Sequence, residues 1–492
     1  MLNGYNEDIE DVEIIIGTNT EIVKNLPKFV NYYRVKQGSM LFSDKIKSLR
    51  EAEKITQSTM AKALGIGVPM YSRIERGERS VRKEQIPIIA EALKTDSEEL
   101  LKLWLADQMA ALMDGEEEVF NEVMDITKDK MNIANIGNGK IGVLDLFCGC
   151  GGISKGFEMS GYYITGGIDF NKDATDTFAR NFKNAKVICG DISEVTDDQI
   201  RSLYGKTDVI IGGPPCQGFS SANRWQKEKD DPRNKLFFQY IRFVDVLRPK
   251  AILIENVRGL LTRDNGYAKD RITELLTEMN YSVSMSVLDA SDYGVPQCRK
   301  RAIIIGINKD FCSKEFDFSK LKVLPKVTVD EALSDIYGFE DQIGTTQFEQ
   351  AKPMSSYQKL MKDGTTVLLD HEVRYPADIV QKRISFVPQG GNWSDVPSEL
   401  WPSQRNNRHS SAYKRLKQDA QSCTIDTGNA HSNYFHPLFN RIPSVRESAR
   451  LQSFPDSFEF EGSRGSKYKQ VGNAVPPLLA KAIADLLKDY IK

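Results

Sequence analysis

Residues 143–152 read VLDLFCGCGG, an apolar run that ends in a turn dense with glycine. Similar apolar runs follow at 208–213 (DVIIGG), 251–256 (AILIEN) and 301–307 (RAIIIGI), separated by segments with helical character. Alternation of short apolar strands with helices is typical of a mostly parallel sheet with helical crossovers. We therefore expect an α/β fold from about residue 141, with an amphipathic helix from Pro477 to Ile491 that returns to its core.

Glycine and carboxylate residues follow three successive strands of this predicted sheet. The glycine turn at 149–152 comes first, Asp169 follows in GGIDFN, and Asp191 follows in GDI. A glycine turn lets a nucleotide-like ligand approach the backbone, and a carboxylate can accept hydrogen bonds from the two hydroxyls of a ribose. The spacing is not the G-x-G-x-x-G of dinucleotide-binding folds, so an adenosine pocket is favoured over an NAD site. For the glycines alone, a tight turn without a ligand stays an alternative.

The segment that points to covalent chemistry is GGPPCQGFS at 212–220, directly after the apolar strand at 208–211. Two prolines restrict the backbone before Cys216, which is presented at the carboxyl end of a strand, where open α/β sheets bind ligands. Most cysteines are small apolar core residues. The glycine, proline and polar neighbours of Cys216 favour an accessible nucleophile instead.

At this point the chain resembles the cytosine-5 DNA methyltransferase family, in which PPCQ followed by ENV is highly specific. The resemblance covers nearly everything from Ile141 to the C-terminus, except the variable region before Arg446. One departure is Cys150, where many relatives have another apolar residue. Cys148 and Cys150 have no further ligands nearby, so no metal site is expected. The matching blocks, in family order, are DLFCGCGG (145–152), PPCQGFS (214–220), ENV (255–257), QCRKR (297–301), RESARLQSFP (446–455) and QVGNAVPP (470–477).

The resemblance implies transfer of a methyl group from S-adenosylmethionine to carbon 5 of a cytosine in a specific duplex DNA sequence. Cys216 would add to carbon 6, and Glu255 would hydrogen-bond ring nitrogen 3 and the exocyclic amine. Arg299 and Arg301 would help hold the base and the catalytic loop. Because attack comes from above the ring plane, the cytosine must be flipped out of the duplex.

The family's other site residues carry over to named positions of this chain. Gln217 and Ser220, in a loop suited to close over the flipped base, would contact DNA. The expected S-adenosylmethionine site comprises Phe147, Gly149, Gly151, Asp169, Phe170, Asp191, Ile192, Pro215, Leu236, Asn473 and Val475.

The region from 321 to 440 is rich in Pro, Ser, Asn and Gln and corresponds to the family's smaller, irregular target-recognition domain. A basic run at 404–417 includes Arg405 and Arg408, which are expected to contact DNA phosphates. Taken alone, this run favours a solvated loop or helix face. PQGGNW at 388–393 and CTIDTGNAHSN at 423–433 are the expected places of base readout.

Residues 56–77, TQSTMAKALGIGVPMYSRIERG, resemble the helix-turn-helix of Cro and phage repressors. Thr56 is predicted to cap a helix that ends at Gly65, and Pro69 begins a second helix running to about residue 76. The second helix would enter the major groove, where Arg73 is the expected DNA contact. Valine, proline and methionine replace the usual polar readers there, which leaves phosphate or apolar contacts. A plain helical bundle used for dimerisation or partner docking is the alternative.

The whole-chain properties bound these interpretations. At 492 residues, with 40% hydrophobic and 27% charged residues, the chain is expected to fold as several domains. Seven irregularly spaced cysteines, a polar N-terminus and no membrane-length apolar stretch favour the cytoplasm and argue against a disulfide framework. The expected organisation is an N-terminal extension (1–38), a helix-turn-helix domain (39–106), a helical linker (107–140), a catalytic domain (141–320), a target-recognition domain (321–440) and the C-terminal part of the catalytic domain (441–492).

Three functions remain distinguishable at this stage. The favoured one is an S-adenosylmethionine-dependent methyltransferase of a restriction-modification system, with a cognate endonuclease as a functional partner and an N-terminal domain that binds DNA and regulates its own operon. The second is a transfer-RNA methyltransferase with the same catalytic blocks. The third is a catalytically silent DNA-binding protein. The oligomeric state and the recognised bases stay open.

Overall fold

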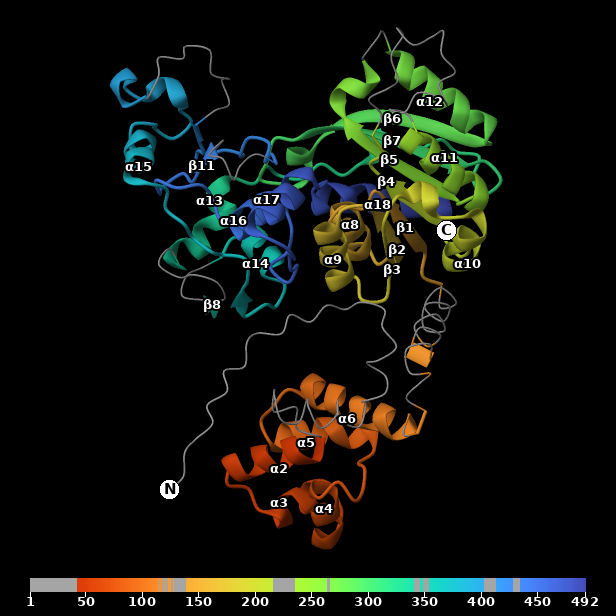
Figure 1. Cartoon of the computed structure of the whole chain (residues 1–492), viewed down its shortest axis with the longest axis vertical. Coiled ribbons are helices and arrows are strands. Elements are labelled where there is room, and N and C mark those ends of the chain that lie inside the picture. Colours follow the sequence, from red (N-terminus) through yellow and green to blue (C-terminus); the bar gives the residue numbers. More distant parts are fainter. Residues whose placement is uncertain are drawn as a thin grey trace, which may run out of the picture. The chain divides into compact units, whose positions relative to one another are not determined.

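The chain folds into two compact units, 1–130 and 131–492 (Figure 1). The computed structural model describes residues 42–113, 115–116, 119, 123–124, 127, 139–215, 235–262, 266–339, 346–347, 354–401, 413–427 and 434–492. No helix in these ranges is long and apolar enough to span a membrane.

The N-terminal unit is a bundle of short helices. Thr56 caps α3 by accepting a hydrogen bond from the Thr59 amide at 3.1 Å, Gly65 has a positive φ of 64° in the turn, and Pro69 lies in the first turn of α4, as predicted. The domain boundary expected at 106/107 falls inside α6. The elements are α2 (Phe42–Ala52), α3 (Gln57–Ala63), α4 (Val68–Glu75), η2 (Lys83–Gln85), α5 (Ile86–Ala92) and α6 (Ser97–Leu112).

A buried ion pair joins three helices of this unit. Glu75, only 4% exposed, lies with its Oε1 2.5 Å from Nε of Arg50 in α2. Gln57 at the start of α3 donates to Glu75 Oε2 at 2.7 Å. Because an unpaired buried charge is costly, these contacts hold α2, α3 and α4 in one arrangement.

The second unit is built on a seven-stranded sheet in the order β3-β2-β1-β4-β5-β7-β6. All pairs are parallel except those of β7, which is antiparallel to β5 and β6, so the predicted mostly parallel α/β fold is confirmed. Only residues 290–299 join β6 to β7, too few for a parallel crossover. The strands are β1 (Gly142–Leu146), β2 (Tyr163–Asp169), β3 (Lys186–Cys189), β4 (Val209–Gly212), β5 (Ala251–Val257), β6 (Tyr281–Asp289) and β7 (Lys300–Asn308).

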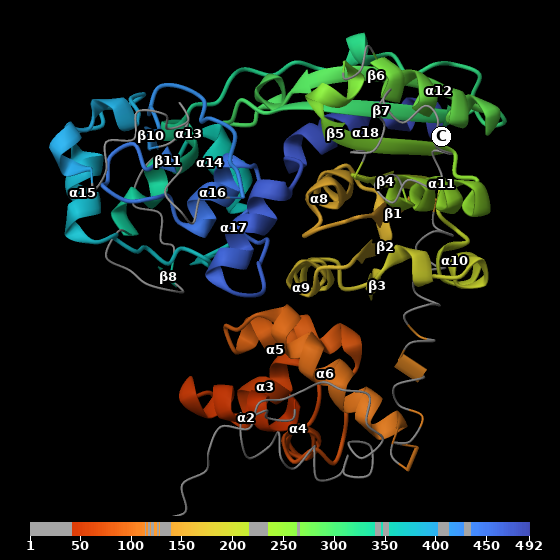
Figure 2. The same cartoon turned by 45° about the horizontal axis from the view of Figure 1, so that its top comes forward.

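Helices cover both faces of the sheet (Figure 2). Val143 and Ile211 pack with residues of α8 (Gly152–Met159), α9 (Lys172–Asn181) and α18 (Pro477–Ile491). Leu144 and Ile210 point to the opposite face, which is covered by α10 (Asp197–Tyr204), α11 (Lys235–Leu247) and α12 (Tyr267–Glu278). Successive strand residues point to opposite faces, so strands buried on both sides are apolar throughout.

The predicted C-terminal helix, α18, packs closely against α8. A Cβ on Gly156 would lie 2.4 Å from the Pro477 carbonyl oxygen, and one on Gly152 would lie 2.4 Å from that of Val475. These two glycines therefore let the last helix return to the first helix of the sheet domain.

Residues from about 321 to 440 contain only short elements, consistent with the irregular region predicted there. Buried ion pairs link it to the helix that follows, including Arg450 with Asp335 and Arg446 with Asp370. The elements are η10 (Phe318–Lys320), α13 (Val329–Leu333), η11 (Ser334–Phe339), β8 (Thr346–Gln347), α14 (Ser356–Lys362), β9 (Val367–Leu368), α15 (Asp378–Ser385), η12 (Trp393–Asp395), η13 (Ser398–Leu400), β10 (Lys414–Arg415) and β11 (Tyr434–Phe435), followed by α16 (Val445–Leu451) and α17 (Arg464–Asn473). The sheet domain also contains η4 (Ile192–Glu194), η7 (Arg258–Leu261) and η9 (Ala290–Tyr293).

Candidate functional site

A cavity of about 780 Å³ lies where the carboxyl ends of β1, β2, β4 and β5 meet, the edge at which open α/β sheets bind ligands. Ten of the eleven expected cofactor residues line it: Phe147, Gly149, Asp169, Phe170, Asp191, Ile192, Pro215, Leu236, Asn473 and Val475. The remaining wall includes Glu255, which was predicted as a catalytic residue, and residues that were not predicted: Asp145, Asn171, Ala174, Ser466, Lys469 and Gln470.

Gly151 is the expected cofactor residue that does not line the cavity. It is the N-cap of α8 with a φ of 95°, and a Cβ there would lie 2.5 Å from the ring of Phe182 and 2.9 Å from that of Phe178. Only glycine combines this conformation with such close packing. Its role here is to let the turn approach α9.

The carboxylate of Asp169 organises the turn that opens the cavity. Oδ2 accepts a hydrogen bond from the Gly149 amide at 2.9 Å, and Oδ1 accepts one from the Asn171 amide at 2.9 Å. Asp191 is held similarly, because its Oδ1 accepts from the Ser193 amide at 2.8 Å, and these hydrogen bonds lower its pKa. Both carboxylates are thus oriented acceptors, with lone pairs left for a ligand.

Glu255 lies at the sheet edge next to β4. It follows Ile254, which pairs with Gly212, so its carboxylate lies beside Gly213 and lines the cavity. Its Oε1 is 2.8 Å from Nε of Arg301, and the two side chains are 15% and 17% exposed. Burial raises the pKa of Glu255, while Arg301 and Arg299 act in the opposite direction. The group can therefore hold a proton above the usual pH range of a glutamate.

Arg299 and Arg301 have different surroundings. Arg299 is 2% exposed and donates to the carbonyl oxygens of Ile425 at 3.0 Å and Gly472 at 2.8 Å. Burial lowers the pKa of Arg299 to about 9. Arg301 instead contacts Glu255 directly. Arg299 therefore joins the start of β7 to the region from about 321 to 440 and to α17, and Arg301 is the arginine beside the Glu255 carboxylate.

The chain that leads to the predicted nucleophile is anchored by Asn256. Its Nδ2 donates to the Pro214 carbonyl oxygen at 3.0 Å, two residues before Cys216. Cys216 lies outside the described residues, as do the predicted DNA contacts Gln217, Ser220, Arg405 and Arg408. The ENV motif therefore supplies both the Glu255 carboxylate and, through Asn256, the hydrogen bond that holds the chain just before Cys216.

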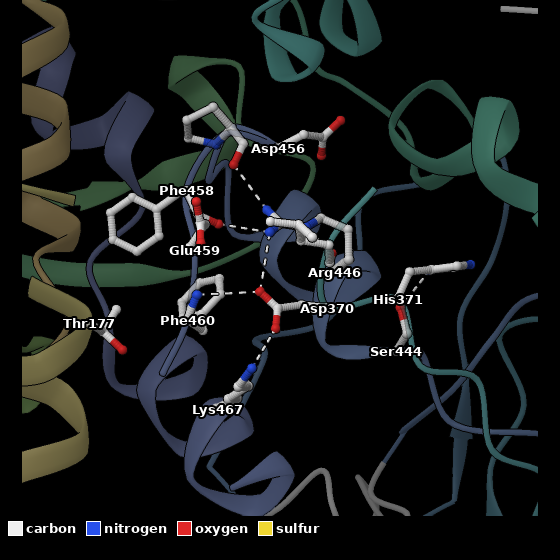
Figure 3. Close-up of polar contacts among 12 residues, drawn as sticks. Thr177, Asp370, His371, Ser444, Arg446, Asp456, Phe458, Glu459, Phe460 and Lys467 are labelled. Atoms are coloured by element: carbon white, nitrogen blue, oxygen red, sulfur yellow. Dashed lines mark hydrogen bonds and ion pairs between the residues drawn. The ribbon is translucent and has the colours of Figure 1, made fainter. Parts of the chain in front are cut away.

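Helix α17 carries one wall of the cavity and is held by contacts from the region between about 321 and 440. Asp370 accepts from Lys467 Nζ at 2.7 Å and lies 3.3 Å from Nη2 of the buried Arg446 (Figure 3). On the side of α9, Gln470 accepts from the Thr177 hydroxyl at 2.7 Å. These contacts orient the face of α17 that bears Ser466, Lys469 and Asn473.

The largest omission of the sequence reasoning is Asp145. The sequence feature that could have identified it is a single carboxylate inside the apolar strand VLDLF, where packing of the sheet does not require a charged residue.

Cys148 and Cys150 are buried free thiols. Within the described ranges, no group of three or more His, Cys, Asp or Glu side chains is placed to hold a metal ion.

Arg73 in the N-terminal unit is exposed on α4. Val68, in the same helix, is 41% exposed. By contrast, Arg76 is engaged by Glu78, with Nε 2.6 Å from Oε1. The exposed residues of α4 therefore include the apolar Val68 and Pro69 together with Arg73.

Comparisons with known proteins agree with this site. The sequence profile of the C-5 cytosine-specific DNA methylase family matches residues 141–489, and a helix-turn-helix profile matches 46–100. The chain is 36% identical over 372 residues to the type II methyltransferase M.DdeI of Desulfomicrobium norvegicum, covering 71% of this chain and 89% of that protein. It is 29% identical over 469 residues to M.Sau96I of Staphylococcus aureus, covering 93% and 99%.

A solved structure extends the comparison. A protein described as a DNA modification methyltransferase encoded within an E. coli prophage matches with a TM-score of 0.58 and 26% identity. The match covers 71% of this chain and 99% of the other. Similarity therefore extends over nearly the whole of that relative.

Proposed function

The chain belongs to the C-5 cytosine-specific DNA methylase family, so it is a DNA (cytosine-5)-methyltransferase, and we propose that it takes its methyl group from S-adenosylmethionine. The observation that carries the proposal is the meeting of the glycine turn, the Asp169 carboxylate and Glu255 around one cavity. A site for methyl transfer to a base needs a cofactor pocket that opens onto the catalytic groups.

The cavity fits S-adenosylmethionine in size and in chemistry. Asp169 and Asp191 are oriented acceptors for the hydroxyls and amine of an adenosine, and the rings of Phe147 and Phe170 supply apolar contact area. Phe170 is 79% exposed, as expected for a ring that a ligand covers. When bound, S-adenosylmethionine supplies a methyl group on a positively charged sulfur.

The groups around Glu255 suit the activation of a cytosine. Cys216 forms a bond from its thiolate to carbon 6, which makes carbon 5 nucleophilic. Glu255, whose pKa is raised by burial, donates a proton toward ring nitrogen 3 and limits the charge that develops on the ring. Arg301 holds the Glu255 carboxylate, and Arg299 holds the backbone carbonyls of Ile425 and Gly472. Once carbon 5 carries the transferred methyl group, loss of its proton to a base and expulsion of the Cys216 thiolate from carbon 6 restore the aromatic ring.

Covalent trapping tests this chemistry. Duplex DNA with 5-fluorocytosine at the target base should form a stable adduct with the wild-type chain in the presence of S-adenosylmethionine, because fluorine blocks the loss of the carbon 5 substituent. Cys216→Ser should form none. An adduct that survives this substitution would overturn the role of Cys216, and methyl transfer to RNA but not to duplex DNA would favour the transfer-RNA alternative.

Recognition of a specific duplex sequence within a restriction-modification system completes the proposal. It is supported by similarity to type II methyltransferases over most of their length. Gln217, Ser220, Arg405 and Arg408 are proposed to contact DNA around the flipped cytosine. Bisulfite sequencing of DNA from an expressing host should reveal one methylated sequence, and scattered methylation without a common sequence would contradict it.

A second function, DNA binding by the N-terminal unit, is supported by the helix-turn-helix match and the exposed Arg73. We propose that this unit binds the promoter of its own operon. The full chain should retard a promoter fragment in competition with unrelated DNA, and Arg73→Ala should weaken retention while leaving methyl transfer unchanged. Equal retention of both DNAs by the wild-type chain would remove the regulatory role.

A further inference from the structure

Two free cysteines from distant parts of the sequence, Cys298 and Cys423, lie beside each other in the second unit. Gln297 and Ser422 form a parallel β-bridge, so the residues that follow them are also neighbours. The Cys298 amide donates to the Ser422 carbonyl oxygen at 3.0 Å, and the Thr424 hydroxyl donates to the Cys298 carbonyl oxygen at 2.8 Å. Cys298 is thus hydrogen-bonded to the residues on either side of Cys423, which places the two cysteines opposite each other.

The spacing of the two backbones suits a disulfide. Adjacent strands lie about 4.8 Å apart, and disulfides join Cα atoms that are roughly 4.4–6.8 Å apart. Residues that face each other on parallel strands direct their side chains to the same side of the pair. In agreement with this, the thiols of Cys298 and Cys423 interact electrostatically.

Buried side chains fix the register of this pairing. Gln297 and Arg299, which flank Cys298, are 0% and 2% exposed. Gln297 Oε1 accepts from the Ile425 amide at 2.9 Å, and Arg299 Nη1 donates to the Ile425 carbonyl oxygen at 3.0 Å. Because a shift of either segment would break buried hydrogen bonds, the two cysteines are held opposite each other.

The two thiols differ in access to solvent. Cys298 is exposed, whereas Cys423 is half-buried. Burial raises the pKa of Cys423 to about 11, although Lys414 acts in the opposite direction. Since oxidants react first with accessible thiols, Cys298 is the cysteine that is attacked first, and Cys423 is placed to react with the product.

We propose that Cys298 and Cys423 are a redox modification site, at which hydrogen peroxide converts the two thiols into a disulfide. The Cys298 sulfur attacks one peroxide oxygen, the O–O bond breaks, and the departing oxygen leaves as water after taking up a proton. The Cys423 sulfur then attacks the sulfenic acid on Cys298, the S–O bond breaks, and a second water leaves as the S–S bond forms. The thiols lose two electrons and two protons in total, and the peroxide is reduced to two waters.

Peptide mapping of the full chain tests the proposal. Trypsin separates the two cysteines into peptides 272–299 and 418–441, each of which contains one cysteine. After peroxide treatment of the folded chain and capping of the remaining thiols, mass spectrometry should find these two peptides joined, and dithiothreitol should release them. Cys298→Ser and Cys423→Ser should each abolish the joined peptide. Cys312→Ser, which removes another half-buried cysteine, is the matched control and should retain it.

Thermal unfolding provides a second measurement that does not depend on methyl transfer, which oxidation of Cys216 would itself affect. A link between residues 298 and 423 closes a long loop and restricts the unfolded chain. The peroxide-treated wild-type chain should therefore melt about 3–6 °C higher than the same sample after dithiothreitol, and Cys298→Ser should show no such difference.

The opposite results are equally clear. Oxidation of Cys298 to a sulfinic acid while Cys423 stays free would overturn the proposal, as would a disulfide that joins either residue to a different cysteine. A joined peptide that appears only when peroxide is added to the denatured chain would show that the fold does not bring the thiols together. An equal rise in melting temperature for the wild-type chain and Cys298→Ser would also refute the link.

Discussion

The contact between α8 and α18 leads to a sharp prediction for Gly156→Ala. The added Cβ would lie 2.4 Å from the Pro477 carbonyl oxygen, 2.5 Å from Ala480 Cβ and 2.7 Å from the Lys481 amide nitrogen. Two of these atoms belong to the backbone, so α18 has to move by about 1 Å to restore ordinary contact distances. Overpacking of about 3 kcal/mol, offset by about 1 kcal/mol of helix propensity, gives a net loss of ~2 kcal/mol.

The same displacement should reach the cavity. Ala474 and Val475 line it directly before α18 begins, so we expect roughly tenfold weaker binding of S-adenosylhomocysteine, because small misplacements of site residues are costly. Urea unfolding followed by circular dichroism measures the first effect, and calorimetric titration measures the second.

Gly465→Ala is the matched control, since Gly465 lies in α17 with no atom within 4 Å of the added Cβ. It should be neutral or stabilising by about 0.5 kcal/mol. If Gly156→Ala unfolded at the same urea concentration as this control and bound the ligand normally, the close approach of α8 and α18 would be refuted.

Three further predictions concern polar side chains with specific partners or surroundings. Glu447→Gln leaves Arg441 buried without its ion pair at 2.7 Å and should cost about 3–5 kcal/mol in urea unfolding, against under about 1 kcal/mol for Glu459→Gln at the exposed pair with Arg180. Burial alone would raise the pKa of Glu447, but Arg441 and His436 lower it below that of a free glutamate. The stability difference between the wild-type chain and Glu447→Gln should therefore be full above about pH 4.3 and disappear as the pH falls further. A difference that did not change with pH would contradict the pairing. Asp145→Asn should stabilise the ligand-free protein at pH 8 by up to about 4 kcal/mol, because burial raises the pKa of Asp145 to about 7 and penalises the charged carboxylate. This gain in the free energy of unfolding should shrink between pH 7 and 4. Destabilisation at pH 8 would contradict the prediction. Asn256→Ala removes the hydrogen bond to the Pro214 carbonyl and should lower the methyl-transfer rate by about 10- to 100-fold without changing the melting temperature; an unchanged rate would show that this anchor does not position Cys216.

Much of the site could be predicted because many of its residues lie in short contiguous sequence motifs. The PPCQ and ENV blocks and the glycine turn each combine a strand end with unusual residue types, so their order along the chain indicated both the fold and the pocket. Pro477 to Ile491 also forms the predicted helix, since its apolar periodicity is strong. Local propensity and pattern suffice where one segment contains the whole signal.

Partnerships between distant segments required the tertiary structure. Asp145 and Glu255 are both single carboxylates at strand positions, yet one faces a hydroxyl and open cavity, and the other faces Arg301. Arg299 and Arg301 likewise have different partners only because of the fold: Arg299 donates to the carbonyls of Ile425 and Gly472, which are more than 100 residues away in the chain.

The sequence by itself determined the alternation of apolar strands with helices from about residue 141, the pocket-forming turns and the family. The tertiary structure decided which buried charges have partners and which remain for a ligand. The physical reason is that hydrophobic periodicity is a property of neighbouring residues, whereas desolvation and ion pairing depend on what the fold brings within a few ångströms.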